Sequence, residues 1–551
     1  MFLVRTEIQR RGGFRAVIRH LPRLGPACLI AVVLLLLACG FRVSAVGRLG
    51  ALWRDEIHSA IVAGTGAAPL WWDSFPVLWN GLLSVWLALV GGSDFSLRTL
   101  GLLLGLVLCG VSAWAPRWSG AGFGWSGLAM LGLSPVVVVF GSQCRGYALG
   151  VALGVAMLGL YAAIVRRAGS ARFWWGTLAV TLLAVQSMYM NSIFCGAGVI
   201  GGMAALAAVG RWKDLFKLFG VGAVAGLTMV PYVLVVFPAL SEWAVIVRSP
   251  VGWDRLVGTF LGVLTASGFI AAALWVTLPA ATVLFGVGRT LRELDDPSPE
   301  GNVPLFAATT CLLGTIVGFA YIKFLNVPTQ AWYYMPFLGL WTICADSGLG
   351  AIAWSTRARA LWLTVIVAAG GLQVAGTMSS PGMRITNLDI VARFVANEAA
   401  PTDRVYVKPW YFGLTFDRYY RGAAKWSTIP AMPPEEFING YRHMKRVMAT
   451  REQIDRELGE IADLLRSGGR VWIVGELGDL YRPGMPLELP PAPSSPYGWS
   501  EIAYERVWEG RLMEVLKQHG ASLRLHQPGS EFPVNRFESP RVYEVQGKPS
   551  R

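Results

Sequence analysis

The first apolar run of the chain, GPACLIAVVLLLLACGFRVSA at residues 25–45, decides the fold class. A helix needs about 20 apolar residues to cross the hydrocarbon core of a bilayer. Six arginines precede this run, at positions 5, 10, 11, 15, 19 and 23, and no convincing small-residue cleavage site follows it. These features predict an uncleaved signal anchor whose basic segment, residues 1–24, stays in the cytoplasm.

Ten more apolar runs of similar length follow, each rich in Leu, Val, Ala and Gly. They lie near residues 98–116, 123–141, 148–165, 174–190, 193–210, 215–237, 268–288, 303–321, 333–352 and 360–378. Overall, 54% of the residues are hydrophobic and only 15% are charged, a balance that an ordinary globular core does not require. We therefore predict an α-helical polytopic membrane protein with about 11 transmembrane helices over residues 25–380.

Arginine and lysine gather in alternate loops, and this pattern orients a chain across a membrane. With the amino terminus inside, the cytoplasmic loops hold Arg117, Arg166, Arg167, Arg172, Arg211, Lys213, Lys217, Arg289, Arg292, Arg357 and Arg359. The opposite loops are longer in sum and hold fewer cations. An odd number of spans then places residues 384–551 outside the cytoplasm. We expect the membrane to be the bacterial inner (plasma) membrane.

Charged residues become frequent from residue 384 onward, which marks the main domain boundary. Beyond it, the pattern predicts helices at 387–397, 434–467 and 502–519 and strands at 404–408 and 470–475. Alternating helices and strands favour a small α/β domain. We predict that residues 384–551 form a soluble, extracytoplasmic α/β domain.

Cysteine placement and net charge exclude two classes of function. All seven cysteines precede the boundary, mostly in apolar runs, and none has the spacing of a zinc site. We expect them to be buried small hydrophobic residues. The net charge of +14 would suggest nucleic acid, but its distribution argues against this partner. We expect the chain to contact the lipid bilayer and no nucleic acid.

The first outer loop, residues 46–97, is neither apolar enough to span a membrane nor polar enough for a plain linker. It contains Trp53, Trp71, Trp72, Trp79 and Trp86, and this composition favours a membrane interface. Asp55 and Glu56 stand beside Arg54 and close to His58, and Asp73 lies further along. Near a hydrophobic surface, burial and neighbouring charges tune a carboxylate's affinity for protons. The alternative is a solvated turn.

Three motifs in order carry a family resemblance. LWRDEIHSA at 52–60 resembles the Asp-Glu motif in the first outer loop of polytopic GT-C glycosyltransferases, of the dolichyl-phosphate-mannose protein mannosyltransferase and aminoarabinose transferase type. GSDFSLR at 92–98 is similar to that family's lead into the second span. SQCRGYAL at 142–149 resembles its second outer loop. The resemblance covers most of the membrane part and is sharpest over residues 50–165.

The resemblance implies a membrane glycosyltransferase. Its donor would be a sugar on a polyprenyl phosphate, and its acceptor an extracytoplasmic glycan, lipid or protein. Asp55 would be the general base of a single, inverting displacement. Glu56 would orient Asp55 or bind the acceptor.

Cations at the outer ends of spans are candidates to hold the departing phosphate. A charge near the membrane costs free energy unless it pairs with an opposite charge or binds a ligand. Arg145, Arg98 and Lys323 fit this description. Gln143 and Tyr147 add hydrogen-bonding groups to the loop of Arg145. The alternative for Arg98 and Lys323 is snorkelling of the charge to the lipid headgroups.

Two aromatic or imidazole groups complete the predicted substrate site. Tyr333 lies in the loop KFLNVPTQAWYY at 323–334, which resembles in position the late outer loop from which relatives contact the donor. The alternative is an interfacial aromatic belt. His58 is a second candidate, for a carboxylate partner or simply for the interface.

Departures from the family pattern leave other functions open. The His-Pro-Pro-Leu string common in the family's first loop is here FPVL at 75–78. Some members carry an acidic residue in the second outer loop, where this chain has Arg145 and Tyr147. We therefore predict no cofactor; the alternative is a divalent metal, which no second acidic motif supports. The alternative function is a non-catalytic lipid-binding membrane protein or a transporter, although we find no convincing internal repeat.

Overall fold

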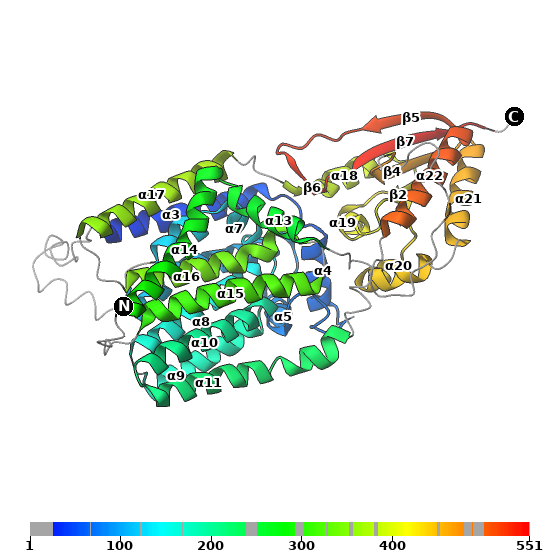
Figure 1. Ribbon diagram of the computed structural model, residues 1–551. Helices are drawn as coiled ribbons and strands as arrows, with labels where there is room; N and C mark the ends of the chain where they lie inside the picture. The colour runs from blue at the N-terminus through cyan, green and yellow to red at the C-terminus, as the bar shows by residue number, and fades with distance from the viewer. Residues whose placement is uncertain are drawn as a thin grey trace, which may run out of the picture.

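The structure is a computed structural model that describes residues 26–66, 68–121, 124–167, 169–238, 251–292, 302–326, 329–351, 356–379, 384–448, 452–478, 488 and 501–549. A bundle of long helices carries an α/β region at one end (Figure 1). The basic segment predicted at residues 1–24 lies outside the described residues.

Eight helices among the described residues are long and apolar enough to cross a membrane, judged by length and composition. They are α3 (Pro26–Arg48), α6 (Asp94–Trp114) with η1 (Ala115–Ser119), α8 (Tyr147–Arg166), α10 (Tyr189–Ala208), α11 (Trp212–Leu227) with η3 (Tyr232–Val236), α14 (Phe269–Arg292), α15 (Val303–Leu325) and α17 (Thr356–Ser379). Many of their Leu, Val and Phe side chains are exposed, as they would be toward lipid. The chain is an integral membrane protein with a helical membrane part, as predicted.

The other three predicted spans are helical but shorter. They are η2 (Gly127–Leu131) with α7 (Pro135–Phe140), α9 (Ala171–Val185), and α16 (Met335–Gly350) after η4 (Ala331–Tyr334). The first of these breaks before Pro135, and Ser134 is extended with φ −59° and ψ 129°. Proline disfavours helical backbone at the residue before it, which explains the break. The total of eleven crossings stays a prediction.

Two amphipathic or surface helices lie at the end of the bundle that faces the α/β region, α4 (Arg54–Gly64) and α13 (Trp253–Thr265) (Figure 1). In α13, Leu256, Phe260, Val263 and Leu264 are buried, at the spacing of one helical face. Helix α5 (Val77–Val90) follows α4 along the chain and matches the surface helix expected in the first outer loop.

The α/β region is built on a five-stranded sheet of order β3-β2-β4-β7-β5. Its strands are β2 (Arg404–Val407), β3 (Lys425–Thr428), β4 (Arg470–Gly475), β5 (Gly520–His526) and β7 (Arg541–Gly547). Strands β3, β2 and β4 run parallel, and β7 pairs antiparallel with β4 and β5. This confirms the predicted α/β class, although β3, β5 and β7 were not predicted.

Six helical elements accompany the sheet: α18 (Leu388–Glu398), α19 (Phe412–Tyr419), η5 (Pro434–Asn439), α20 (Gly440–Met448), α21 (Glu452–Arg466) and α22 (Glu501–His519). The single helix predicted at 434–467 is therefore wrong, because η5, α20 and α21 are separate elements. The predicted helices at 387–397 and 502–519 correspond to α18 and α22.

A small parallel ladder joins the α/β region to the bundle. It pairs β1 (Arg384–Thr386) with β6 (Val534–Glu538), and the Ile385 N–H donates to the Leu49 carbonyl at the end of α3 (3.1 Å). On the other side of this junction, Arg418 forms an ion pair with Asp94 at the start of α6 (2.6 Å). The α/β region is thus anchored to both ends of the first outer loop.

Glycines allow the outer loops to approach the bundle closely. A Cβ on Gly101 of α6 would lie 2.6 Å from the Ser142 carbonyl oxygen, and one on Gly146 would lie 2.8 Å from the ring of Phe75. Any larger residue at either position would push the second outer loop away from its neighbours. The first contact brings residues 142–147 against α6, and the second brings them against the first outer loop, where the candidate site forms.

Candidate active site

Helix α4 begins just after Trp53 and carries the Asp-Glu pair in its first turn. Acidic side chains are favoured there, because the unpaired N–H groups of a first turn give it a partial positive charge. The Glu56 carboxylate accepts the Trp53 N–H (3.3 Å) and closes the turn. The Asp55 side chain stays 29% exposed, while that of Glu56 is completely buried. The two neighbouring carboxylates therefore occupy opposite environments.

Glu56 acts as an internal brace. Its Oε1 accepts hydrogen bonds from Arg98 (2.6 Å) and from the Cys144 N–H (2.8 Å). Arg98 also donates to the carbonyls of Gly50 (3.3 Å) and Ala51 (2.8 Å). Glu56 and Arg98 thereby tie α4 to α6 and to the second outer loop. Both side chains lie beneath the site, where they can support it but face little solvent.

Arg145, from the second outer loop, is the centre of a buried polar cluster. Its Nη1 donates to the Asp55 carbonyl (2.9 Å) and to the Ser59 hydroxyl, and it lies 3.3 Å from both carboxylate oxygens of Asp73. Its Nη2 donates to the Ser74 hydroxyl (2.8 Å). Burial opposes the charged guanidinium, but Asp73, Tyr147 and Asp55 together outweigh burial and raise the pKa of Arg145. The predicted phosphate ligand is therefore firmly ionised and directly behind Asp55.

Asp73 belongs to this polar cluster, although the sequence motifs did not single it out. Burial alone would raise the pKa of its carboxyl, but Arg145 and His58 hold that pKa below its usual value. The Ser59 hydroxyl (2.6 Å) and the Ser74 N–H (2.5 Å) donate to it and act in the same direction. No motif surrounds Asp73 in the sequence, so only its place in the first outer loop hinted at this role.

His58 lies one turn after Asp55 on α4 and reaches the α/β region. Its ring hydrogen-bonds the Ile438 carbonyl, which also accepts the Trp72 indole N–H (3.1 Å). Burial lowers the pKa of His58, although Asp73 favours the charged form. A neutral ring that donates to a carbonyl presents its other nitrogen as an acceptor.

The predicted residues Tyr147 and Tyr333 both lie close to Asp55. The charge of Asp55 acts on each phenol, and Tyr147 also hydrogen-bonds Arg145. Trp332 packs against Tyr147 at a ring-centroid distance of 6.3 Å and against Tyr333 at the same distance. The structure therefore brings the first, second and late outer loops together around Asp55.

The side chains of Gln143 and Lys323 form no hydrogen bond with this cluster among the described residues. Gln143 is fully buried, and neither of its amide atoms has a hydrogen-bond partner among the described residues. Lys323 donates to the Val251 carbonyl, and its ammonium lies 5.9 Å from the centroid of the Trp253 ring. Lys323, in the last turn of α15, therefore contacts the start of α13, the helix that carries Arg255.

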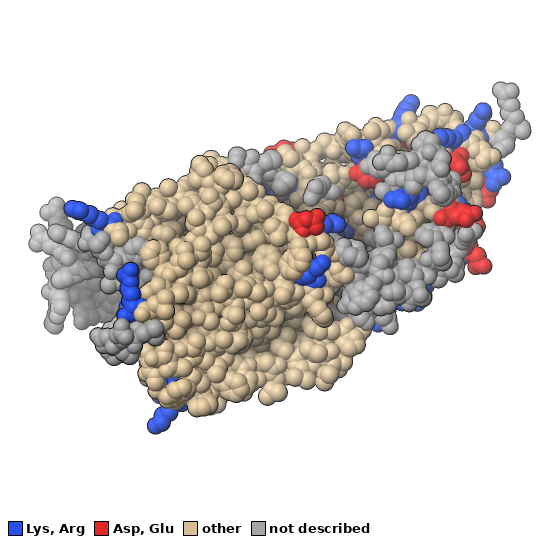
Figure 2. Space-filling model, viewed as in Figure 1, with Lys and Arg blue, Asp and Glu red and all other residues tan. Residues whose placement is uncertain are grey.

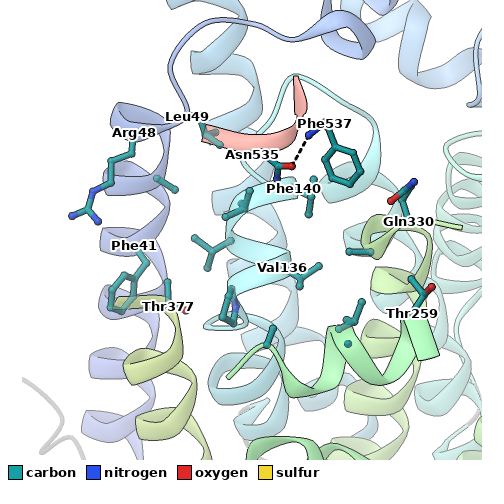
Figure 3. Close-up of a pocket in the computed structure, with 18 of the residues that line it drawn as sticks. Phe41, Arg48, Leu49, Val136, Phe140, Thr259, Gln330, Thr377, Asn535 and Phe537 are labelled. Atoms are coloured by element: carbon teal, nitrogen blue, oxygen red, sulfur yellow. Dashed lines mark hydrogen bonds between the residues drawn. The ribbon is translucent and has the colours of Figure 1, made fainter. Parts of the chain in front are cut away.

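A groove of about 940 Å³ opens between helices of the bundle and strand β6. Side chains from α3, α7, α13, α17, η4 and β6 line it, most of them apolar (Figure 3). Phe140 and Phe537 close one end, and Arg48 extends away from its centre. Arg255, Thr259 and Gln330 supply polar groups. Its size and its apolar wall suit a hydrocarbon chain.

An aromatic wall separates the groove from Asp55. The Trp332 ring packs against Phe140 (4.9 Å), Trp53 (5.5 Å) and Phe537 (5.6 Å), measured between ring centroids. Two of these rings, Phe140 and Phe537, also line the groove. Trp53 lies two residues before Asp55, so the groove and the polar cluster share one wall.

Across the described parts of the chain, no group of three or more His, Cys, Asp or Glu side chains could hold a metal ion. The second carboxylate near Asp55, that of Asp73, is engaged by Arg145.

No family model matches the chain, and no curated protein sequence matches it. Its structure is similar to several solved structures of GT-C fold glycosyltransferases. One is ArnT from Cupriavidus metallidurans bound to undecaprenyl phosphate, at 13% identity and a TM-score of 0.47, over 80% of this chain and 92% of that one.

A second is the oligosaccharyltransferase of Archaeoglobus fulgidus tethered to an acceptor peptide, at 10% identity and a TM-score of 0.48, over 91% of this chain and 73% of that one. A third is the mycobacterial arabinofuranosyltransferase AftD, at 13% identity and a TM-score of 0.41, over 94% of this chain and 42% of that one.

Proposed function

We propose that this protein is an inverting membrane glycosyltransferase that moves a sugar from a polyprenyl-phosphate donor to an extracytoplasmic glycan, lipid or protein. One observation carries the proposal. The partly exposed carboxylate of Asp55 stands among Arg145, Tyr147 and Tyr333, next to a wall shared with an apolar groove. A base, a cation and a lipid-sized groove at one surface are the parts that this chemistry requires.

In the proposed reaction, the Asp55 carboxylate takes the proton of the acceptor hydroxyl as its oxygen bonds to the anomeric carbon of the sugar. The bond between that carbon and the phosphate oxygen breaks in the same step, and its electron pair stays on the phosphate. A single displacement inverts the configuration at the anomeric carbon. The donor carries its own leaving group, so we propose no cofactor.

Two cations near the groove support a binding site there for the phosphate of the donor. Arg255 of α13 lines the groove, and Lys323, in the last turn of α15, contacts Val251 and Trp253 at the start of α13. Arg145 is held by Asp73 and adds positive charge directly behind Asp55. We assign the phosphate contact to Arg255 and Lys323. This replaces the assignment of Arg145 made from the sequence, because its guanidinium is engaged by Asp73 and by the Asp55 backbone carbonyl.

The proposal also includes the bacterial inner membrane and an outward-facing site. On the face seen in Figure 2, Lys and Arg gather at the end of the bundle farthest from the α/β region, and no acidic side chain of the described residues is visible there. The α/β region carries both signs of charge. This distribution supports a cytoplasmic end opposite the α/β region, because membrane proteins concentrate basic residues on the cytoplasmic side.

A lipid-binding protein or transporter without chemistry is the second candidate. The groove favours it, because a hydrocarbon chain could occupy 940 Å³ without any reaction at Asp55. The glycosyltransferase and the binding protein differ in one respect: only the glycosyltransferase requires a carboxylate that accepts a proton from the acceptor.

Turnover by the purified full-length protein tests the proposal. A panel of undecaprenyl-phosphate-linked sugars is offered with a cell-envelope extract as the source of acceptor, and release of undecaprenyl phosphate is measured. We expect turnover of at least one donor, and its loss in Asp55→Asn. The matched control, Asp463→Asn, makes the same change at a carboxylate that is 73% exposed on α21. Binding of undecaprenyl phosphate with no turnover of any donor would favour the second candidate, and full activity of Asp55→Asn would overturn the base assignment.

A further inference from the structure

Strand β6 of the α/β region ends in a carboxylate that touches the first residue of α4. Glu538 is fully buried, and its Oε1 accepts the backbone N–H of Arg54 (3.1 Å). Its Oε2 accepts the Thr415 hydroxyl (3.2 Å), and Thr386 also hydrogen-bonds it. Two threonines of the α/β region therefore fix the carboxylate, and the carboxylate in turn holds the residue directly before Asp55.

Strand pairing determines where Glu538 lies. Its backbone carbonyl accepts the Asn387 N–H (3.1 Å), next to the ladder between β1 and β6. The preceding residue, Phe537, packs against Trp53 and Trp332 at ring-centroid distances of 6.4 and 5.6 Å. The end of β6 thus reaches both the aromatic wall and the start of α4.

The electrostatics of Glu538 and Asp55 are linked. Burial raises the pKa of Glu538 to about 7, the nearby charge of Asp55 adds to this effect, and Arg54 opposes it. The Arg54 guanidinium itself lies 4.3 Å from the centroid of the Tyr411 ring, on the α/β region. Burying a carboxylate costs folding free energy unless hydrogen bonds or an opposite charge compensate for its lost hydration.

We infer that Glu538 is a positioning residue for the transfer step: by holding the Arg54 N–H it fixes the first turn of α4 and the direction of the Asp55 carboxylate. This inference rests on the proposed function of Asp55. It also gives the α/β region a part in the reaction, because the site would be incomplete without β6. A purely structural anchor would instead affect folding and leave turnover per folded molecule unchanged.

Two variants separate these roles. Glu538→Gln keeps an oxygen that can accept the Arg54 N–H, whereas Glu538→Ala removes it. The control is Glu544→Gln on β7, a carboxylate that pairs with Arg470 and His526, away from α4. Hydrogen–deuterium exchange of peptides within residues 50–64 reports on the first turn of α4, and turnover of the active donor from the panel reports on the reaction.

For Glu538→Ala we expect exchange in the first turn of α4 to rise at least tenfold and kcat to fall about tenfold or more, with KM for the donor unchanged. Glu538→Gln should restore most of the protection and most of kcat, and Glu544→Gln should change neither. Unchanged exchange in Glu538→Ala, or unchanged kcat with raised exchange, would overturn the inference. If the wild-type protein turns over no donor, the proposed function fails, while the exchange data still decide whether Glu538 holds α4.

Discussion

On one face of α4, Glu56 is sealed against Arg98 and the Cys144 N–H; on the other, Asp55 keeps 29% of its side chain exposed beside Arg145. The two residues are adjacent in sequence and chemically alike. Their surroundings differ because Glu56 meets α6 and the second outer loop, whereas Asp55 meets the space that the three outer loops share.

This contrast teaches that the Asp-Glu motif combines two functions in one turn of helix. Glu56 fixes where α4 sits, and Asp55 is left available for a substrate. The two arginines differ in the same way: Arg98 pairs with Glu56, whereas Arg145 pairs with Asp73 and donates to the backbone carbonyl of Asp55. Variants on the two faces should therefore fail differently, one in the reaction and the other in folding.

The largest effect is expected for Asp55→Asn. Loss of a general base typically lowers kcat by about 10²–10⁴-fold. The side chain is partly exposed, so the midpoint of unfolding in detergent should match that of the wild type. Steady-state turnover and SDS-induced unfolding measure the two quantities. A large loss of stability would mean that Asp55 belongs to the structural face after all.

Glu56→Gln should produce the opposite pattern. It leaves Arg98 buried without its counter-charge, and breaking a buried pair typically costs about 3–5 kcal/mol of folding free energy. The measurement is the free energy of unfolding in detergent, with the exposed Glu452→Gln as control. Activity per folded molecule should stay within a few-fold of wild type. Wild-type stability with lost kcat would assign Glu56 to the reaction.

The third-largest effect is expected for the ion pair between Arg145 and Asp73. Removing either partner leaves the other buried and uncompensated, so Arg145→Met and Asp73→Asn should each destabilise the protein. The double variant should be less destabilised than the sum, with an interaction energy of about 0.5–3 kcal/mol. A double-mutant cycle on unfolding free energies measures this term. Simple additivity would show that the two side chains act independently.

The pH dependence of the junction gives a smaller effect. The pKa of Glu538 is raised from its ordinary 4.5 to about 7, so its protonated form is favoured where β6 contacts α4. The resulting stability is fully present below pH 4.5 and is lost as pH rises through about 7, by up to about 1.4 kcal/mol per pH unit. Thermal unfolding at pH 5.5 and 8.5 tests this. Glu538→Gln should remove this part of the pH dependence, and an equal dependence in that variant would contradict it.

The smallest effect is expected at His58. Its ring is neutral and hydrogen-bonds the Ile438 carbonyl, so His58→Gln should retain the contact and His58→Ala should lose it. We expect a loss of kcat of about tenfold or less in His58→Ala and near-normal turnover in His58→Gln. A loss as large as that of Asp55→Asn would move the base assignment from Asp55 to His58.

Local sequence was enough for the helices and for part of the site. The apolar runs predicted each long helix, because membrane crossing depends on the composition of about 20 consecutive residues. The three motifs predicted that Asp55, Arg145 and Tyr147 belong together, and the structure brings them together. Asp73 was not singled out, because no pattern distinguishes it from a solvated acid until Arg145 is packed against it.

The sequence by itself determined that this is a polytopic membrane protein with a charged α/β region after residue 384, because hydropathy and charge are local properties of the chain. Only the tertiary structure decided which acid is buried and which is open. Glu538 meets Arg54 across 484 positions of sequence, and Ile438 meets Trp72 across 366. Such contacts depend on strand pairing and loop packing between distant segments, which no local pattern encodes.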